Sequence, residues 1–181
     1  MLYASTMPIT IIIGTNRPHS LSAVVAHHCA HLFERKGVLT HLLNLQELPE
    51  DFAFSALYAN KKKNSQVNTM IAHMDESVKY LFVVPQYNGS FPGVLKTFID
   101  AYASPKIFKG KKAALIGVSK GYQGNLLGLS HLGDILYYLG MTIYPVQPKL
   151  ANIVHPDIDL VKKNPRYIAH LEEQASGFID F

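Results

Sequence analysis

The sequence predicts a doubly wound α/β domain on a five-stranded parallel sheet, and two observations lead to that prediction. Short runs that are almost continuously apolar alternate with longer segments in which apolar residues recur at helical spacing. The apolar runs lack the alternation of a half-exposed strand, which is typical of parallel strands covered on both faces. They begin roughly 30 to 40 residues apart, which is the length of a strand, a crossover helix and the return.

Five segments are predicted as strands because they are short, rich in β-branched and aromatic residues, and bounded by glycine, proline or polar residues. In chain order they are residues 9–14, 38–43, 80–85, 113–119 and 141–146.

Five segments are predicted as helices from apolar stripes at helical spacing. The stripe of the first includes Cys29, and Gly37 follows it as a stop signal. Pro92 stands in the first turn of the third helix, where its missing N–H does no harm. The predicted helices are residues 20–36, 66–79, 92–102, 125–139 and 165–178, the second and the last with weaker patterns.

The 181 residues are predicted to form a single domain, residues 1–181, since no internal repeat or Pro- or Gly-rich linker divides them. A second possible start at Met7 indicates that residues 1–6 are an unstructured extension. The longest irregular stretch covers residues 46–64 and contains Lys61 to Lys63. It is either a solvated loop or a phosphate-binding loop.

Composition narrows the function classes. The 17 basic and 13 acidic residues leave a net charge of +4, which suits an anionic small ligand but is too small and scattered to indicate nucleic acid. The single cysteine excludes an internal disulfide framework and fits a reducing compartment. No apolar run is long enough to cross a bilayer, and no secretory signal opens the chain. We therefore expect a cytoplasmic protein with no membrane or nucleic-acid partner.

The loop after the first predicted strand carries the strongest functional signal. It offers the hydroxyls of Thr15, Ser20 and Ser22, the guanidinium of Arg17, and a helix N-terminus. Unpaired N–H groups and the positive dipole end favour a phosphate there, and an arginine adds a charge-assisted contact. The alternative is a capped helix start, since serine is a good N-cap in any protein. With one glycine and no Gly-Lys-Ser/Thr motif, the loop fits a monophosphate better than a dinucleotide or a nucleoside triphosphate.

Two further loops leave the same edge of the predicted sheet. In residues 85–93, Asn88 and Gly89 favour positive φ, and Tyr87 supplies a flat apolar surface. Such a loop suits the edge of a planar, heteroatom-rich ring, although an ordinary tight turn has the same composition. Residues 119–125 are glycine-rich and could bring backbone donors to the other side of that ring.

Three motifs together carry a family resemblance. They read Gly14-Thr15-x-Arg17-x-x-Ser20, then Pro85-Gln86-Tyr87-Asn88-Gly89-Ser90-x-Pro92-Gly93-x-Leu95-Lys96, then Phe108-x-Gly110-Lys111. In order and spacing, from about residue 8 to 150, they resemble the NADPH-dependent FMN reductase family. Its members include quinone, azo-dye and chromate reductases on a flavodoxin-like, three-layer α/β/α fold.

The resemblance implies tight, non-covalent FMN, with NADPH or NADH as co-substrate. Hydride would pass through the flavin to a quinone, free flavin, azo compound or similar small acceptor by a ping-pong mechanism, so no residue is expected to be catalytic. It also implies a homodimer or homotetramer. The implied cofactor-binding residues are Thr15, Arg17, Ser20, Leu21 and Ser22 around the phosphate, and Pro85, Gln86, Tyr87, Asn88, Gly89, Ser90, Ser119, Lys120 and Gly121 around the ring.

The sequence departs from the family pattern at three places. Gln86 stands where the family usually has glutamate, and Asn44 where aspartate is common. Residues 125–133 lack the arginines often found there, which bears on NADPH binding and assembly.

Other candidate sites are interpreted as structural. His27 and His31 lie one helical turn apart beside Cys29, but that turn carries the core stripe, so no metal is predicted. Lys96 and Asp100 read as a surface ion pair. The aromatic residues Phe98, Tyr102, Tyr137 and Tyr138 belong either to the core or to a subunit interface.

Two other functions remain open at this point. A flavodoxin-like electron carrier would bind FMN without oxidising NADPH, although such carriers are usually acidic and this chain is not. A non-redox binding module would keep the fold and bind no flavin.

Overall fold

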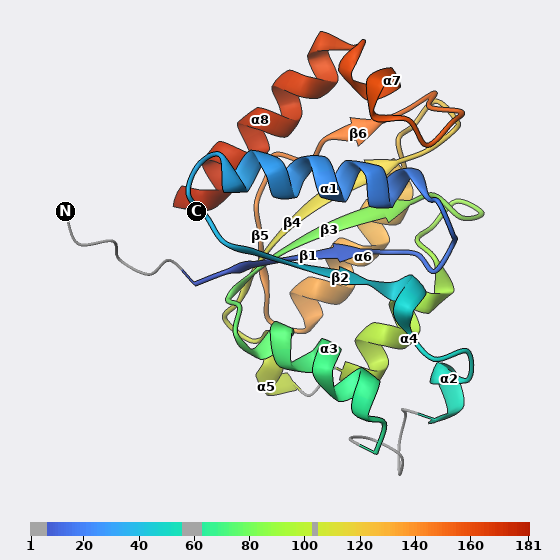
Figure 1. Cartoon of the computed structure of the whole chain (residues 1–181), viewed down its shortest axis with the longest axis vertical. Coiled ribbons are helices and arrows are strands. Elements are labelled where there is room, and N and C mark those ends of the chain that lie inside the picture. Colours follow the sequence, from blue (N-terminus) through green and yellow to red (C-terminus); the bar gives the residue numbers. More distant parts are fainter. Residues whose placement is uncertain (1–6, 56–62, 103–104) are drawn as a thin grey trace, which may run out of the picture.

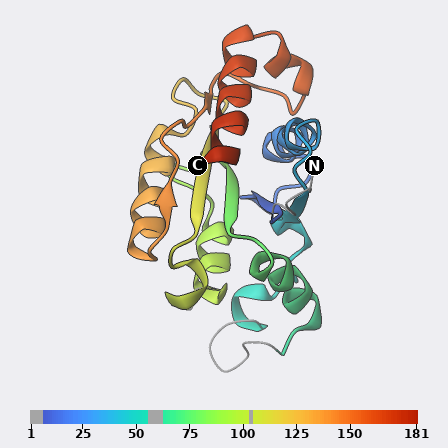
Figure 2. The same cartoon turned by 90° about the vertical axis from the view of Figure 1, so that its left-hand side faces the viewer.

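The computed structural model describes residues 7–55, 63–102 and 105–181, and these form a parallel sheet between two layers of helices (Figures 1 and 2). The predicted extension over residues 1–6, and Lys61 and Lys62 of the predicted loop, lie outside the described residues.

The strands are β1 (Ile9–Ile13), β2 (Thr40–Asn44), β3 (Lys79–Pro85) and β4 (Lys112–Val118), followed by two short strands, β5 (Thr142–Ile143) and β6 (Lys149–Leu150). The sheet order is β2-β1-β3-β4-β5, and every pairing is parallel. This is the doubly wound order of flavodoxin-like folds, so the predicted fold class is confirmed.

The fifth position of the sheet differs from its predicted extent, residues 141–146. There β5 pairs with the start of β4 and β6 with its end. Pro145 and Pro148 lie between the two short strands. Because proline has no N–H to donate to a ladder, a continuous strand cannot form across this stretch.

Helices cover both faces of the sheet. On one face lie α1 (Leu21–Glu34), α7 (Ile158–Lys162) and α8 (Pro165–Asp180), and on the other α3 (Ser65–Asp75), α4 (Gly93–Tyr102) and α6 (Leu126–Tyr138). Side chains alternate along β1, so that Ile11 and Ile13 pack on the first layer and Ile12 on the second. Both sets are buried, which explains the continuous apolar runs.

The stretch predicted as irregular, residues 46–64, is partly helical. It overlaps a 3-10 helix, η1 (Leu45–Glu47), and contains α2 (Phe52–Ser55). A third short helix, α5 (Pro105–Phe108), follows α4. The side chain of Asn44 accepts a hydrogen bond from the N–H of Gln46 at 3.1 Å and so caps η1. The residue at position 44 therefore has a local structural role, which the carboxylate of an aspartate could also fill.

Local signals place the helix ends. Ser20 is the N-cap of α1, and its hydroxyl accepts from the N–H of Ala23 at 3.1 Å. The helix predicted over residues 66–79 ends earlier, at Asp75, because Ser77 turns inward to hydrogen-bond the hydroxyl of Thr10 at 2.7 Å and Lys79 already begins β3. Among the helices of the described residues, none is both long and apolar enough to cross a membrane.

The structure separates the residues whose interpretation the sequence left open. Phe98 and Tyr102 are buried core residues, whereas Tyr137 and Tyr138 are exposed on α6. Cys29 is buried, and burial raises the pKa of its thiol to about 12, so it is no nucleophile. The predicted surface pair is present, with Lys96 Nζ 2.7 Å from a carboxylate oxygen of Asp100.

Candidate functional site

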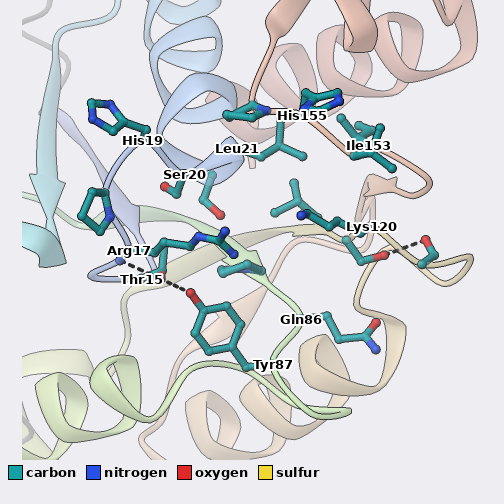
Figure 3. A pocket seen from close by; sticks show the side chains of 18 residues that line it. Thr15, Arg17, His19, Ser20, Leu21, Gln86, Tyr87, Lys120, Ile153 and His155 are labelled. Atoms are coloured by element: carbon teal, nitrogen blue, oxygen red, sulfur yellow. Dashed lines mark hydrogen bonds between the residues drawn. The ribbon is translucent and has the colours of Figure 1, made fainter.

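A cavity of about 430 Å³ opens at the carboxyl ends of the strands, where ligands bind in doubly wound folds (Figure 3). Four segments enclose it: the loops after β1, β3 and β4, and the segment after β6. The lining residues are Thr15, Arg17, Pro18, His19, Ser20, Leu21, Ser22, Pro85, Gln86, Tyr87, Val118, Ser119, Lys120, Gly121, Ile153, Val154, His155 and Pro156.

The first two loops are joined by a hydrogen bond between hydroxyls. Thr15 Oγ1 lies 3.0 Å from the phenolic oxygen of Tyr87, and it also accepts the N–H of Arg17 at 3.2 Å (Figure 3). Gly14 brings the first loop against β3, since its N–H donates to Val83 O at 2.9 Å. A Cβ at position 14 would stand 3.0 Å from that same oxygen, which is closer than side chains normally approach. The close contact between the loops therefore depends on a glycine here.

The loop after β1 has the donors that a phosphate monoester requires. Ser22 is fully buried, and its Oγ has no hydrogen-bond partner among the described residues. A buried hydroxyl without a partner is costly, so an anionic oxygen that accepts from it would be stabilising. The guanidinium of Arg17 extends into the group of lining side chains in Figure 3, at the N-terminal end of α1. These residues fit the phosphate end of FMN.

The charge of the cavity is one-sided. Arg17 and Lys120 are basic, and the described residues that line the cavity include no carboxylate. Its volume lies in the usual range for small-molecule sites, about 300–1,000 Å³. An anionic ligand of cofactor size therefore suits it in both charge and volume.

The loop after β3 adopts the predicted conformation. Asn88 and Gly89 have φ of 49° and 78°, and two backbone hydrogen bonds, of 2.9 and 3.0 Å, close the turn between Tyr87 and Ser90. The N–H of Ser90 is used inside this turn, whereas those of Asn88 and Gly89 donate to no backbone carbonyl of the described residues. Asn88, Gly89 and Ser90 adjoin the cavity in sequence but are not among its lining residues. Their contact with a flavin ring stays a prediction.

The loop after β4 is held by its own serine. Ser119 Oγ donates to Gly121 O at 2.8 Å, and Ser119 N–H donates to Leu150 O at 2.9 Å. In return Ile153 N–H donates to Ser119 O at 3.2 Å, and Asn152 N–H to Gly121 O at 2.9 Å. These backbone contacts bring the segment after β6 to the cavity.

Sequence reasoning missed this fourth segment, residues 153–156, which includes His155. The fifth strand was expected to end at residue 146, so its carboxyl end was sought too early in the chain. Pro145 and Pro148 were the signal that could have moved the boundary to β6.

Asn125 was also not singled out. It is buried at the start of α6 with φ of 63°, and its Nδ2 donates to the carbonyls of Val84 and Pro85 at 3.2 and 3.1 Å. The carboxyl end of β3, where the loop after β3 begins, is therefore hydrogen-bonded to the start of α6.

Comparisons with known proteins identify the family and the fold. The family model of NADPH-dependent FMN reductases matches residues 7–154. A 2-hydroxy-1,4-benzoquinone reductase of Burkholderia sp. is 27% identical over 150 residues, which cover 76% of this chain and 74% of that one.

Solved structures show the same fold. The flavoenzyme FerB of Paracoccus denitrificans, an NAD(P)H:(acceptor) oxidoreductase, has a TM-score of 0.78 at 23% identity and covers 97% of this chain and 96% of its own. An FMN-dependent NADH-azoreductase of Bacillus anthracis, solved in complex with FMN, has a TM-score of 0.63 at 15% identity, covering 95% of this chain and 99% of its own.

Fold and cavity define a flavodoxin-like domain with a positively charged cavity at the carboxyl edge of its sheet. Because the family match spans most of its length, the chain belongs to the NADPH-dependent FMN reductase family. It is an FMN-dependent NAD(P)H oxidoreductase.

Proposed function

We propose that this enzyme reduces small quinone-type or azo-type acceptors, with FMN held in the cavity at the carboxyl edge of the sheet. One observation carries this placement. The Ser22 hydroxyl is buried without a hydrogen-bond partner among the described residues, and it lines the same end of the cavity as Arg17, at the N-terminus of α1. The names of the related benzoquinone reductase and azoreductase support the class of acceptor.

Each lining segment has a separate task in this proposal. Thr15, Arg17, Ser20 and Ser22 hold the phosphate, because they line the cavity at the N-terminus of α1. Pro85 and Tyr87 lie against the ring, and the loop at Ser119 to Gly121 faces its other edge with the backbone N–H groups of Lys120 and Gly121. FMN, when bound, supplies the two-electron chemistry between NAD(P)H and the acceptor.

The protein's own contribution is binding and electrostatics. The described lining residues hold no carboxylate that would repel an anionic ring or a nucleotide phosphate. Backbone N–H groups and Lys120 stabilise negative charge without rearranging, which is the role of a preorganised site. We propose that NAD(P)H and the acceptor bind in turn at the same open side of the cavity, in a ping-pong order.

We propose a homodimer or homotetramer in the cytoplasm. Four large apolar side chains are exposed on α6, namely Leu126, Leu127, Tyr137 and Tyr138. The helix begins next to the loop after β4, so a partner packed on it would border the cavity. The single buried cysteine fits a reducing compartment.

The test begins with purified protein loaded with FMN. Mass analysis of the released cofactor identifies the flavin, and steady-state oxidation of NADPH and NADH is then followed with benzoquinone, azo-dye and free-flavin acceptors. We expect FMN, turnover with at least one acceptor, and parallel double-reciprocal plots. Bound FMN without NAD(P)H oxidation would indicate an electron carrier instead, and failure to bind flavin would indicate a non-redox module.

A further inference from the structure

A second group of polar side chains lies away from the cavity, near the amino ends of the strands. His41 is on the edge strand β2, His73 is in the last turn of α3, and Glu76 is the C-cap of that helix. One ring nitrogen of each histidine and one carboxylate oxygen of Glu76 all lie within 4.8 Å of one another. Among the described residues, no other group of three His, Cys, Asp or Glu side chains brings its ligand atoms this close together.

The two imidazole rings face each other. Their centroids are 4.7 Å apart at an interplanar angle of 29°. Nε2 of His41 lies 3.1 Å from Oε2 of Glu76, which is an ion-pair distance, yet the atoms are not aligned as a hydrogen bond. The carboxylate and the nitrogen are therefore close without being directed at each other.

Two buried nitrogens in this group have no hydrogen-bond partner among the described residues. They are Nε2 of His41 and Nδ1 of His73. Buried polar atoms are nearly always satisfied, so each such nitrogen calls for a partner. A metal ion would accept the lone pair of a ring nitrogen and remove that cost.

The backbone around the group is held in place. His41 pairs in register with Thr10 of β1, and the hydroxyl of Thr10 donates to the carbonyl of His73 at 3.2 Å. The edge strand and α3 are thereby fixed relative to each other, and only the side chains need to adjust.

We propose that His41, His73 and Glu76 bind one Zn²⁺ or a similar borderline divalent cation. Two imidazoles and one carboxylate are a ligand set that zinc takes, with a fourth position left for water. Ligand atoms bound at about 2.0–2.2 Å in a tetrahedral site stand about 3.4 Å apart. The separation between His41 and Glu76, 3.1 Å, is already short enough, and separations of up to 4.8 Å in the group must close by up to about 1.4 Å. The side chain of Glu76 is 58% exposed and can make this movement.

The bound metal joins the edge strand to the helix that packs beside it. Its role is to brace β2, whose outer edge has no neighbouring strand in the sheet order. The site is separate from the flavin cavity, with which it shares no lining residue. Loss of the metal should therefore leave cofactor content unchanged.

The test uses untagged, FMN-loaded protein that has been treated with a chelator, and Zn²⁺ alone as the probe. Competition against a chromogenic zinc chelator gives the affinity and the stoichiometry. The variants are His73→Ala and Glu76→Gln, the second replacing an exposed side chain so that folding is not at risk. His27→Ala is the matched control, since His27 is an exposed histidine one turn from His31 on α1.

We expect one Zn²⁺ per chain and a higher thermal midpoint in its presence. Each ligand variant should bind at least about 10- to 100-fold more weakly, the range already seen when only an outer partner of a ligand is lost. Co²⁺ should give the visible absorption of a tetrahedral N/O site, and Mg²⁺ should not compete, because it prefers all-oxygen ligands. FMN content should be the same in every variant.

Three results would overturn the proposal. They are no stoichiometric zinc binding, equal affinity in the parent and both ligand variants, or loss of binding in His27→Ala.

Discussion

The placement of the phosphate predicts a specific loss in Arg17→Ala. The side chain of Arg17 is exposed and forms no ion pair within the described residues, and only its backbone N–H bonds Thr15. The free energy of unfolding of the apoprotein should therefore change by no more than about 0.5 kcal/mol. A charge-assisted hydrogen bond to a phosphate contributes about 1.5–3 kcal/mol, so the Kd for FMN should rise about 10- to 150-fold.

The assay compares two flavins on two proteins. Quenching of flavin fluorescence gives the Kd of FMN and of riboflavin, which has the same ring and no phosphate. In Arg17→Ala the affinity for FMN should fall, while that for riboflavin should stay within about two-fold, because riboflavin has no phosphate for the guanidinium to bind. Arg17→Lys keeps the charge but loses the forked donor, so its affinity should be intermediate.

The result that would refute the placement is an equal loss for both flavins, or no loss for either. Equal loss would mean that Arg17 supports the ring or the loop and not the phosphate. Urea unfolding of each apoprotein separates such effects from a change in stability.

Three further predictions concern the same framework. Ser22→Ala should weaken FMN binding about ten-fold. The apoprotein should stay as stable or become up to about 1 kcal/mol more stable, because the substitution removes a buried hydroxyl that has no partner among the described residues. Ser20→Ala removes the N-cap of α1 and should lower the free energy of unfolding by about 1 kcal/mol. Burial, and to a lesser extent nearby positive charges, lowers the pKa of His28 below 6.5. The unfolded chain therefore binds this proton more readily, and stability falls as the pH drops below about 6.5. His28→Gln should reduce this dependence of the thermal midpoint on pH. Asn125→Ala should cost about 2–4 kcal/mol in urea unfolding, from two lost hydrogen bonds to the end of β3 and a strained positive φ, and Asn125→Gly about 1 kcal/mol less.

Each of these has an outcome that would contradict it. A destabilised Ser22→Ala apoprotein would mean that the hydroxyl is satisfied after all. An unchanged pH slope in His28→Gln would assign the acid sensitivity to other groups. Equal stability of the alanine and glycine variants at position 125 would show that the backbone conformation carries no cost there.

Local sequence signals predicted most of the framework. The capping hydroxyl of Ser20, the apolar stripe through Cys29 and the positive φ of Asn88 and Gly89 all depend on neighbours within a few residues, so periodicity and turn chemistry reveal them. The three loops that leave the carboxyl ends of parallel strands follow from the same periodicity. Eleven of the fourteen residues assigned to FMN line the cavity. The other three are Asn88, Gly89 and Ser90, which come directly after Tyr87 in the loop after β3.

Contacts between distant parts of the chain were beyond that reasoning. The segment at His155 reaches the cavity only because two prolines interrupt the last strand, and Thr15 meets Tyr87 across 72 residues. His41 and His73 carry no recognisable motif, since strand β2 and helix α3 bring them together through packing against the sheet. The sequence by itself determined the order of strands and helices and the chemistry offered at each loop, because both arise from near neighbours. Only the tertiary structure decided which of those groups meet, because closure of the sheet and packing of the helices set distances that no local pattern encodes.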